Sequence, residues 1–119
     1  MCLLFLVNKF TNYGMSAQKI NSNIYFGAVQ QGFMNTDCYV QDPTGFLHWL
    51  GWHATYTGVH EVPDYMCGAN EVEILYFHHP DVGGHFVVGD GRGHVAYDPW
   101  GVSMAASRGD LKSKRIFRY

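Results

Sequence analysis

The feature that most constrains the fold is a change in the spacing of apolar residues near Gly51. Before it, apolar residues recur at helical intervals. After it, short runs rich in β-branched and aromatic residues alternate with Gly, Pro and Asp. The pattern predicts helices over residues 2–10, 16–31 and 43–50, and strands over residues 53–60, 72–77, 85–88, 95–97 and 115–119. Helices followed by strands favour an α+β domain, with N-terminal helices packed on an antiparallel sheet.

Residues that cap helices stand at the expected helix ends. Ser16 is suited to the N-cap of the second helix, and Gly32 stands where its C-terminal cap belongs. Asp42 and Pro43 begin the third helix, because Asp accepts from free backbone N–H groups and Pro fits the first helical position. Gly51 ends that helix, so the capping residues agree with the spacing of apolar residues.

Length and composition restrict the class of protein. A chain of 119 residues, of which 47% are hydrophobic, is expected to form one domain over residues 1–119 with a single core. Its net charge of −2 argues against nucleic acid as a partner, because phosphate binding needs a basic excess. The apolar run 1–7 is too short for a membrane span, and it lacks the leading charge and cleavage site of a signal peptide.

Three cysteines do not make a paired disulfide framework, so we expect free thiols and a reducing, cytoplasmic compartment. Histidines and cysteines are also metal-ligand types, but none has the spacing of a zinc site, and we expect neither a metal nor another cofactor. Basic and apolar residues mix over residues 108–119. This pattern predicts an edge strand whose charges keep it from pairing with other chains.

The segment 83–101 carries the strongest functional signal. Two runs of β-type residues flank the turn-rich residues 89–93 (Gly-Asp-Gly-Arg-Gly), which predicts a β-hairpin. With a loop of two or four residues, His85 lies directly opposite Asp98, with Cβ atoms about 5 Å apart. The carboxylate can then accept the imidazole N–H, fix its tautomer and support its positive charge, as in nucleophilic catalysis. A three-residue loop would shift the register by one and break the pairing.

A catalytic His–Asp pair needs a nucleophile, and cysteine is the best candidate because no serine lies in a Gly-x-Ser-x-Gly elbow. Cys2 begins a nearly all-apolar helix, where unpaired backbone N–H groups favour a thiolate and lower its pKa. Its own backbone N–H can also donate to a developing oxyanion. Cys38 is the rival, although the stretch after it reads as extended. Cys67 lies in a loop without supporting context.

Structural interpretations compete with each of these assignments. Seven histidines are spread over the chain, so a His–Asp contact can arise without any catalytic role. Each cysteine can instead be a small buried apolar residue.

The chain therefore combines a Cys at the start of an early buried helix with a mostly antiparallel sheet. The sheet carries residues 84–88 (Gly-His-Phe-Val-Val) and 97–101 (Tyr-Asp-Pro-Trp-Gly). In this the chain resembles the papain-like cysteine peptidase superfamily. The closest likeness is to the compact bacteriocin-leader peptidase domains, which cut after double-glycine leaders, and to their bacterial and phage relatives. In those domains the order is Cys, His, Asp, and the Asp precedes a Pro. The resemblance, strongest over residues 83–101, implies a papain-like fold and a thiol protease with Cys2, His85 and Asp98 as catalytic residues.

One feature of the family is missing. Its members usually carry a Gln about six residues before the Cys, whose amide completes the oxyanion hole, whereas only Met1 precedes Cys2. Gln31 stands near that spacing before Cys38, but Tyr39 replaces the Gly that usually follows the Cys. Three explanations stay open: a start site placed too late, a domain that has lost catalysis, or another donor such as Gln18, Gln30 or Gln31.

The expected function is a thiol-dependent hydrolase of peptide or amide bonds that acts on a peptide or protein substrate. The alternative is a catalytically inactive binding module on the same scaffold, for example a phage- or plasmid-encoded inhibitor of a partner protein. Aromatic residues would then form its recognition surface. The candidates are Trp49, Trp52, Tyr56 and Trp100.

Overall fold

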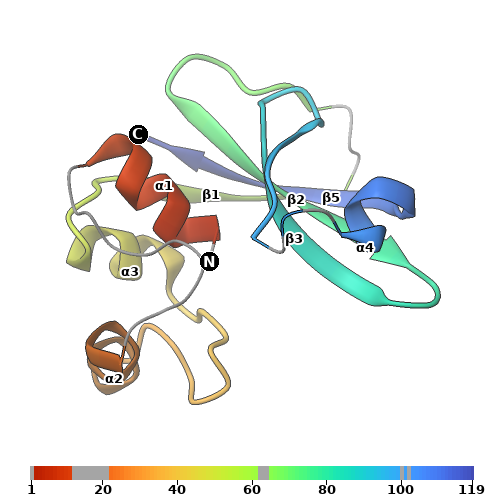
Figure 1. The fold of residues 1–119 in the computed structure, drawn as a ribbon. Helices are drawn as coiled ribbons and strands as arrows, with labels where there is room; N and C mark the ends of the chain where they lie inside the picture. Colours follow the sequence, from red (N-terminus) through yellow and green to blue (C-terminus); the bar gives the residue numbers. More distant parts are fainter. Residues whose placement is uncertain (1, 12–21, 62–64, 100, 102) are drawn as a thin grey trace. The chain divides into compact units, whose positions relative to one another are not determined.

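The computed structural model of the chain describes residues 2–11, 22–61, 65–99, 101 and 103–119. These residues fall into two compact units. Leu3–Thr55 forms the first, and Cys2 belongs by its contacts with Tyr56–Tyr119 to the second. The elements follow in the order α1 (Cys2–Phe10), α2 (Ser22–Gln30), α3 (Pro43–Trp49), β1 (Thr55–His60), β2 (Glu71–His79), β3 (Gly83–Gly89), β4 (Val95–Tyr97), α4 (Met104–Arg108) and β5 (Asp110–Arg118) (Figure 1). No helix in the described ranges is long and apolar enough to cross a bilayer.

The first unit contains the helices α2 and α3 and all but the first residue of α1, which spans the predicted residues. Capping residues define α3 as the sequence predicts. The Asp42 carboxylate accepts from the backbone N–H of Gly45 at 3.0 Å, and a proline is the first helical residue. Gly51 follows the helix with a φ of +97°, a left-handed backbone that glycine adopts without steric cost. The predicted cap at Ser16 lies outside the described residues.

Apolar residues from the three helices and from the segment after α3 form the core of the first unit. The ring of Phe10 stacks on that of Trp52, with centroids 5.0 Å apart. The other buried apolar residues of this unit are Leu4, Leu6, Val7, Ile24, Ala28, Met34, Phe46, Leu47, Leu50 and Ala54. Burial of this set is the main stabilising contribution of the N-terminal part of the chain.

The second unit is built on a five-stranded antiparallel sheet in the order β1-β5-β2-β3-β4. Strand β2 lies at its centre and pairs with β3 on one side and with β5 on the other. The chain therefore changes from helices to strands near Gly51, as predicted, and the α+β class is confirmed. The packing of the N-terminal helices on the sheet and the single-domain organisation stay predictions.

The prediction of a C-terminal edge strand is wrong. Strand β5 is longer than expected and lies between β1 and β2, so the edge strands of the described sheet are β1 and β4. One charged residue of β5 is buried in this interior position and is neutralised inside the protein. The Lys114 side chain is only 1% exposed, and its ammonium lies 3.2 Å from the Glu73 carboxylate.

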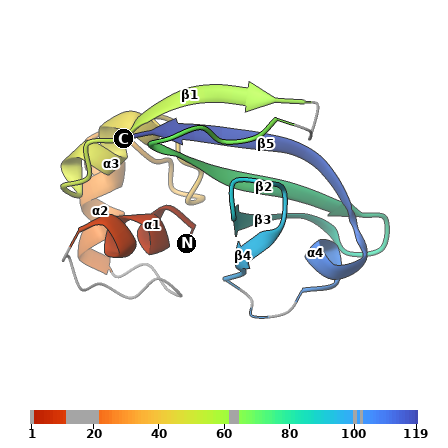
Figure 2. The same ribbon diagram turned by 90° about the horizontal axis from the view of Figure 1, so that it is seen from above.

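Helix α4 packs against β2 and β3 (Figure 2). The sequence pattern does not predict this helix, because five residues are too few for a periodic signal. Its Ala106 contacts a buried cluster formed by Leu75, Phe77 and Val87. Alternate residues of a strand point to the same face, so His85 projects from the face that Val87 occupies. Helix α4 therefore covers the sheet face that carries His85.

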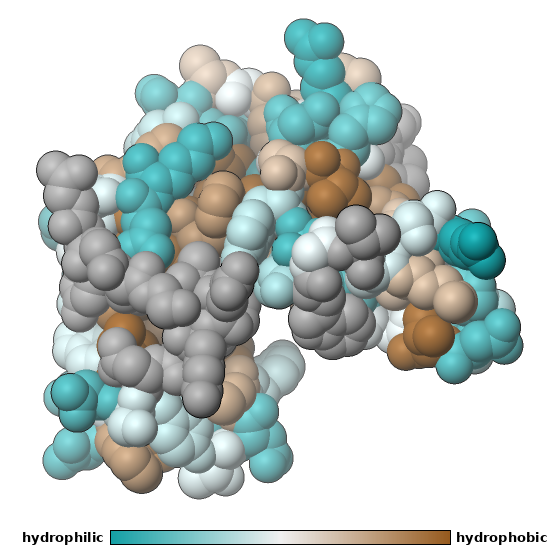
Figure 3. Space-filling view, in the orientation of Figure 1, coloured by the Kyte–Doolittle hydropathy of each residue, from teal (hydrophilic) through white to brown (hydrophobic). Residues whose placement is uncertain are grey.

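The surface near α4 and the β2–β3 turn is a mixture of hydrophobic and hydrophilic residues (Figure 3). Val82 in the turn and Met104 at the start of α4 are both exposed. Isolated apolar residues of this kind are normal on a protein surface and need no partner to explain them.

Candidate active site

The hairpin that carries the site has a register that differs from the predicted one. Its loop has three residues, 91–93, because the backbone N–H of Asp90 donates to the carbonyl of His94 at 2.9 Å. The Asp90 carboxylate accepts from the backbone N–H groups of Arg92 and His94, which stabilises the loop and lowers the pKa of Asp90. A loop of two or four residues is therefore excluded.

A three-residue loop by itself would direct the Asp98 side chain to the sheet face opposite that of His85. A β-bulge returns it to the face of His85. Gly89 pairs with Val95 but Val88 pairs with Tyr97, so Ala96 is an extra residue on β4. Continuing this register by one residue sets Asp98 opposite Val87. Because Val87 and His85 project from the same face, Asp98 is a diagonal neighbour of His85 rather than its direct partner. The two residues meet as predicted, by a different register.

The contact between His85 and Asp98 is short and buried. Nε2 of His85 lies 2.6 Å from Oδ1 of Asp98, and their side chains are 6% and 4% exposed. A carboxylate has only acceptor atoms, so Nε2 carries the proton of this hydrogen bond. The predicted hydrogen bond is confirmed. The fixed tautomer places the lone pair of the neutral imidazole on Nδ1.

A third residue joins the pair. Ser103 donates its hydroxyl to Oδ2 of Asp98 at 2.6 Å and is itself buried. The Ser103 hydroxyl oxygen also accepts from the backbone N–H of Ala106 at 3.2 Å, which makes Ser103 the N-cap of α4. The sequence analysis missed this residue, although a serine directly before Met-Ala-Ala is a recognisable N-cap signal.

Cys2 lies beside the same strand. It is the first residue of α1, is 6% exposed, and its thiol donates to the carbonyl oxygen of Phe86, the residue after His85, at 3.4 Å. Burial, together with the negative charge of Asp98, raises the pKa of Cys2 to about 11. The expectation of a lowered pKa is therefore wrong. Loss of hydration outweighs the stabilisation that a helix N-terminus gives a thiolate.

The two other cysteines lie in different surroundings. Cys38 is exposed in the first unit and has a positive φ of 65°. Cys67 is partly buried in the second unit, and burial together with the charge of Glu73 raises its pKa to about 12. Of the three thiols, Cys2 is the one that contacts the strand of His85 in the described residues.

The other residues considered from the sequence are distributed as follows. Gln30 ends α2 and Gln31 follows it in the first unit, while Gln18 and Trp100 lie outside the described residues. Trp52 is buried and stacked on Phe10, so it cannot form part of a recognition surface. Trp49 is partly exposed, with its ring near those of Phe33 and Phe46.

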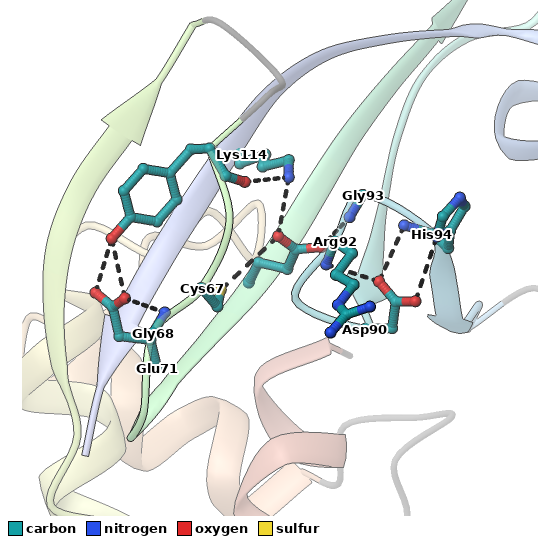
Figure 4. Close-up of polar contacts among 10 residues, drawn as sticks. Cys67, Gly68, Glu71, Asp90, Arg92, Gly93, His94 and Lys114 are labelled. Atoms are coloured by element: carbon teal, nitrogen blue, oxygen red, sulfur yellow. Dashed lines mark hydrogen bonds and ion pairs between the residues drawn. The ribbon is translucent and has the colours of Figure 1, made fainter.

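A buried ionic cluster supports the hairpin from the neighbouring strands (Figure 4). Lys114 of β5, Cys67 and the loop residue Gly93 all converge on the carboxylate of Glu73 in β2. Gly93 donates its backbone N–H to Oε2 at 2.9 Å, and Lys114 also donates to the carbonyl of Tyr65. The cluster therefore fixes the three-residue loop to the centre of the sheet.

Within the described residues, no group of three or more His, Cys, Asp or Glu side chains is arranged to hold a metal ion.

A family model described as "Protein of unknown function, DUF261" matches residues 1–119 of the chain. The chain belongs to the DUF261 family. No curated protein and no solved structure matches it.

The second unit of this DUF261 protein thus joins an imidazole to a carboxylate, and it holds a thiol against the carbonyl of the residue after the imidazole. The carboxylate orients the imidazole, and the oriented ring is a competent general base. A neutral thiol is a weak nucleophile until a base removes its proton.

Proposed function

We propose that the chain is a thiol-dependent hydrolase of peptide or amide bonds, built on a papain-like fold. Cys2 is the nucleophile, His85 the general base and Asp98 the residue that orients His85. The observation that carries the proposal is the buried 2.6 Å hydrogen bond between His85 and Asp98. It is supported by the contact of the Cys2 thiol with Phe86, one residue along the strand from His85.

The proposed reaction has two halves. Nδ1 of His85 takes the thiol proton as the Cys2 sulfur attacks the substrate carbonyl carbon. The imidazolium then protonates the leaving amine, which departs and leaves a thioester. Water attacks the thioester with His85 again as base, and the carboxylic acid and the free thiol are released. The backbone N–H of Cys2, at the first position of α1, donates to the oxyanion in both halves.

The neutral resting thiol shapes this mechanism. With a pKa of about 11, almost no Cys2 is ionised at neutral pH. The protein therefore does not hold a preformed thiolate–imidazolium pair, and His85 must remove the proton during attack. Substrate binding must also displace the hydrogen bond from the thiol to the Phe86 carbonyl. We expect slow turnover for these reasons.

The same observations favour a second candidate, a binding module that has lost catalysis. A buried thiol that donates to a backbone carbonyl and has a raised pKa is typical of a structural cysteine. In that case the substrate-binding surface of a peptidase scaffold binds a partner protein without cleaving it.

A substrate screen separates the two candidates. The full chain is incubated with peptide, isopeptide and muropeptide libraries, and products are followed by mass spectrometry. The hydrolase predicts cleavage that Cys2→Ala and His85→Ala abolish. Cys38→Ala removes an exposed thiol of the first unit and serves as the matched control, which keeps full activity. Absence of cleavage contradicts the hydrolase and leaves the binding module, whereas cleavage that survives Cys2→Ala contradicts the role of Cys2 as nucleophile.

A further inference from the structure

Asp98 is held at both of its carboxylate oxygens. Oδ1 receives the Nε2 proton of His85, and Oδ2 receives the hydroxyl proton of Ser103, each at 2.6 Å. Asp98 follows the last residue of β4, so its side chain lies beyond the strand pairs of the described sheet. A carboxyl group at a strand end can rotate about its terminal torsion unless a second contact fixes its plane. Ser103 supplies that contact.

We propose that Ser103 is a positioning residue for the His85–Asp98 pair. Its hydroxyl fixes the Asp98 carboxylate in the one orientation that presents Oδ1 to the His85 ring. Ser103 is itself fixed, because it caps α4 and α4 rests through Ala106 on the cluster of Leu75, Phe77 and Val87. The sheet face that carries His85 and the helix that positions Asp98 are thus parts of one packed unit.

The hydroxyl performs two separable tasks. As N-cap, the Ser103 oxygen accepts from the N–H of Ala106, a contact that stabilises α4. As positioning residue, the same group donates its proton to Asp98. A charge-assisted hydrogen bond of this kind is about twice as strong as a neutral one. A purely structural role requires only the first task, so the test must separate helix stability from the state of the His85–Asp98 hydrogen bond.

Three variants make this separation. Ser103→Thr keeps the hydroxyl, and Ser103→Val has the shape of Ser103→Thr with a methyl group in place of the hydroxyl. Both are β-branched and suit the extended backbone at this position, with φ of −114° and ψ of 145°. Met104→Gly is the matched control. Met104 is exposed, so this change weakens α4 through helix propensity while the Ser103 hydroxyl stays in place.

The readout is the His85 ring in the NMR spectrum of the intact protein. A short, buried N–H···carboxylate hydrogen bond gives a far-downfield proton signal that exchanges slowly with solvent, and the ring ¹⁵N shifts report the tautomer. We expect wild type, Ser103→Thr and Met104→Gly to share this signal. In Ser103→Val the signal moves upfield or exchanges at least tenfold faster.

The result that overturns the proposal is an unchanged signal in Ser103→Val, or an equal loss in Met104→Gly. If Ser103→Val does not fold, Ser103→Ala, which only removes atoms, replaces it in the same comparison. This measurement needs no substrate, so it stands or falls independently of the proposed hydrolase.

A second arm rests on the proposed function. With a cleaved substrate, Ser103→Val should lower kcat about ten- to a hundredfold with little change in KM, and Ser103→Thr should restore it. If the NMR signal changes in Ser103→Val and the wild-type protein cleaves nothing, the hydrolase is contradicted and the positioning role stays intact. A normal kcat in Ser103→Val contradicts the positioning role and leaves the hydrolase intact.

Discussion

His85 and Asp98 are joined by a 2.6 Å hydrogen bond although the hairpin does not set them directly opposite each other. The three-residue loop turns Asp98 toward the wrong face, and the bulge at Ala96 turns it back. The contact therefore depends on two local irregularities, whose effects on the direction of the Asp98 side chain cancel. Glu73 fixes the loop by accepting from the backbone N–H of Gly93.

Replacement of Asp98 by Asn should remove hydrolysis while leaving the fold in place. An amide at this position can present its NH₂ group to His85 and so favour the wrong tautomer, with the proton on Nδ1. We expect kcat to fall by about a thousandfold or more, as measured on whichever peptide substrate the screen identifies. Circular dichroism should match that of wild type. Activity within tenfold of wild type would contradict the role given to Asp98.

Alkylation should distinguish the three thiols. At pH 8, iodoacetamide should label the exposed Cys38 first and the buried Cys2 much more slowly, because thiolate is the reactive form and Cys2 has a pKa of about 11. Cys67 should also react slowly, since its pKa is about 12. Peptide mapping by mass spectrometry gives the three rates, and unfolding in urea should make them equal. Faster labelling of Cys2 than of Cys38 in the folded protein would contradict the neutral, buried thiol.

The two raised thiol pKa values predict a loss of stability in alkali. Above a pH of about 9 the unfolded chain releases thiol protons that the folded protein still binds. The folded state then binds more protons than the unfolded state, so the free energy of unfolding falls as pH rises from about 9 toward 11. Urea unfolding at pH 8, 9 and 10 measures this slope. Cys2→Ala and Cys67→Ala should each make it shallower, whereas Cys38→Ala should leave it unchanged.

The buried pair of Glu73 and Lys114 predicts a large effect of removing one charge. Lys114→Met leaves the Glu73 carboxylate buried without its cation, which should cost about 3–5 kcal/mol of unfolding free energy. Addition of Glu73→Gln should recover most of the loss, because the amide oxygen still accepts from Gly93. Lys112→Met is the control: Lys112 is exposed and 4.0 Å from Asp110, so little change is expected. Equal urea midpoints for Lys114→Met and wild type would show that the ion pair does not contribute.

Local sequence signals account for the positions of most helices and strands and for the choice of His85 and Asp98 as a pair. Asp42 and Gly51 define α3 because a cap depends on atoms within a few residues. The strand β4 has its predicted bounds. His85 and Asp98 are the predicted partners, although the two- or four-residue loop on which that prediction rests is excluded. Helix α4 is not predicted from the sequence, because its one signal, the N-cap Ser103, precedes only five helical residues.

The sequence by itself determined the α+β class, the helix boundaries that capping residues set, and the choice of His85 and Asp98 as partners. Only the tertiary structure decided the hairpin register, the interior place of β5 and the protonation of Cys2. The physical reason is the range of the interactions involved. Propensity and capping act over a single turn of chain. Register depends instead on a bulge and on the distant carboxylate of Glu73, and the pKa of Cys2 depends on how much water the surrounding atoms exclude.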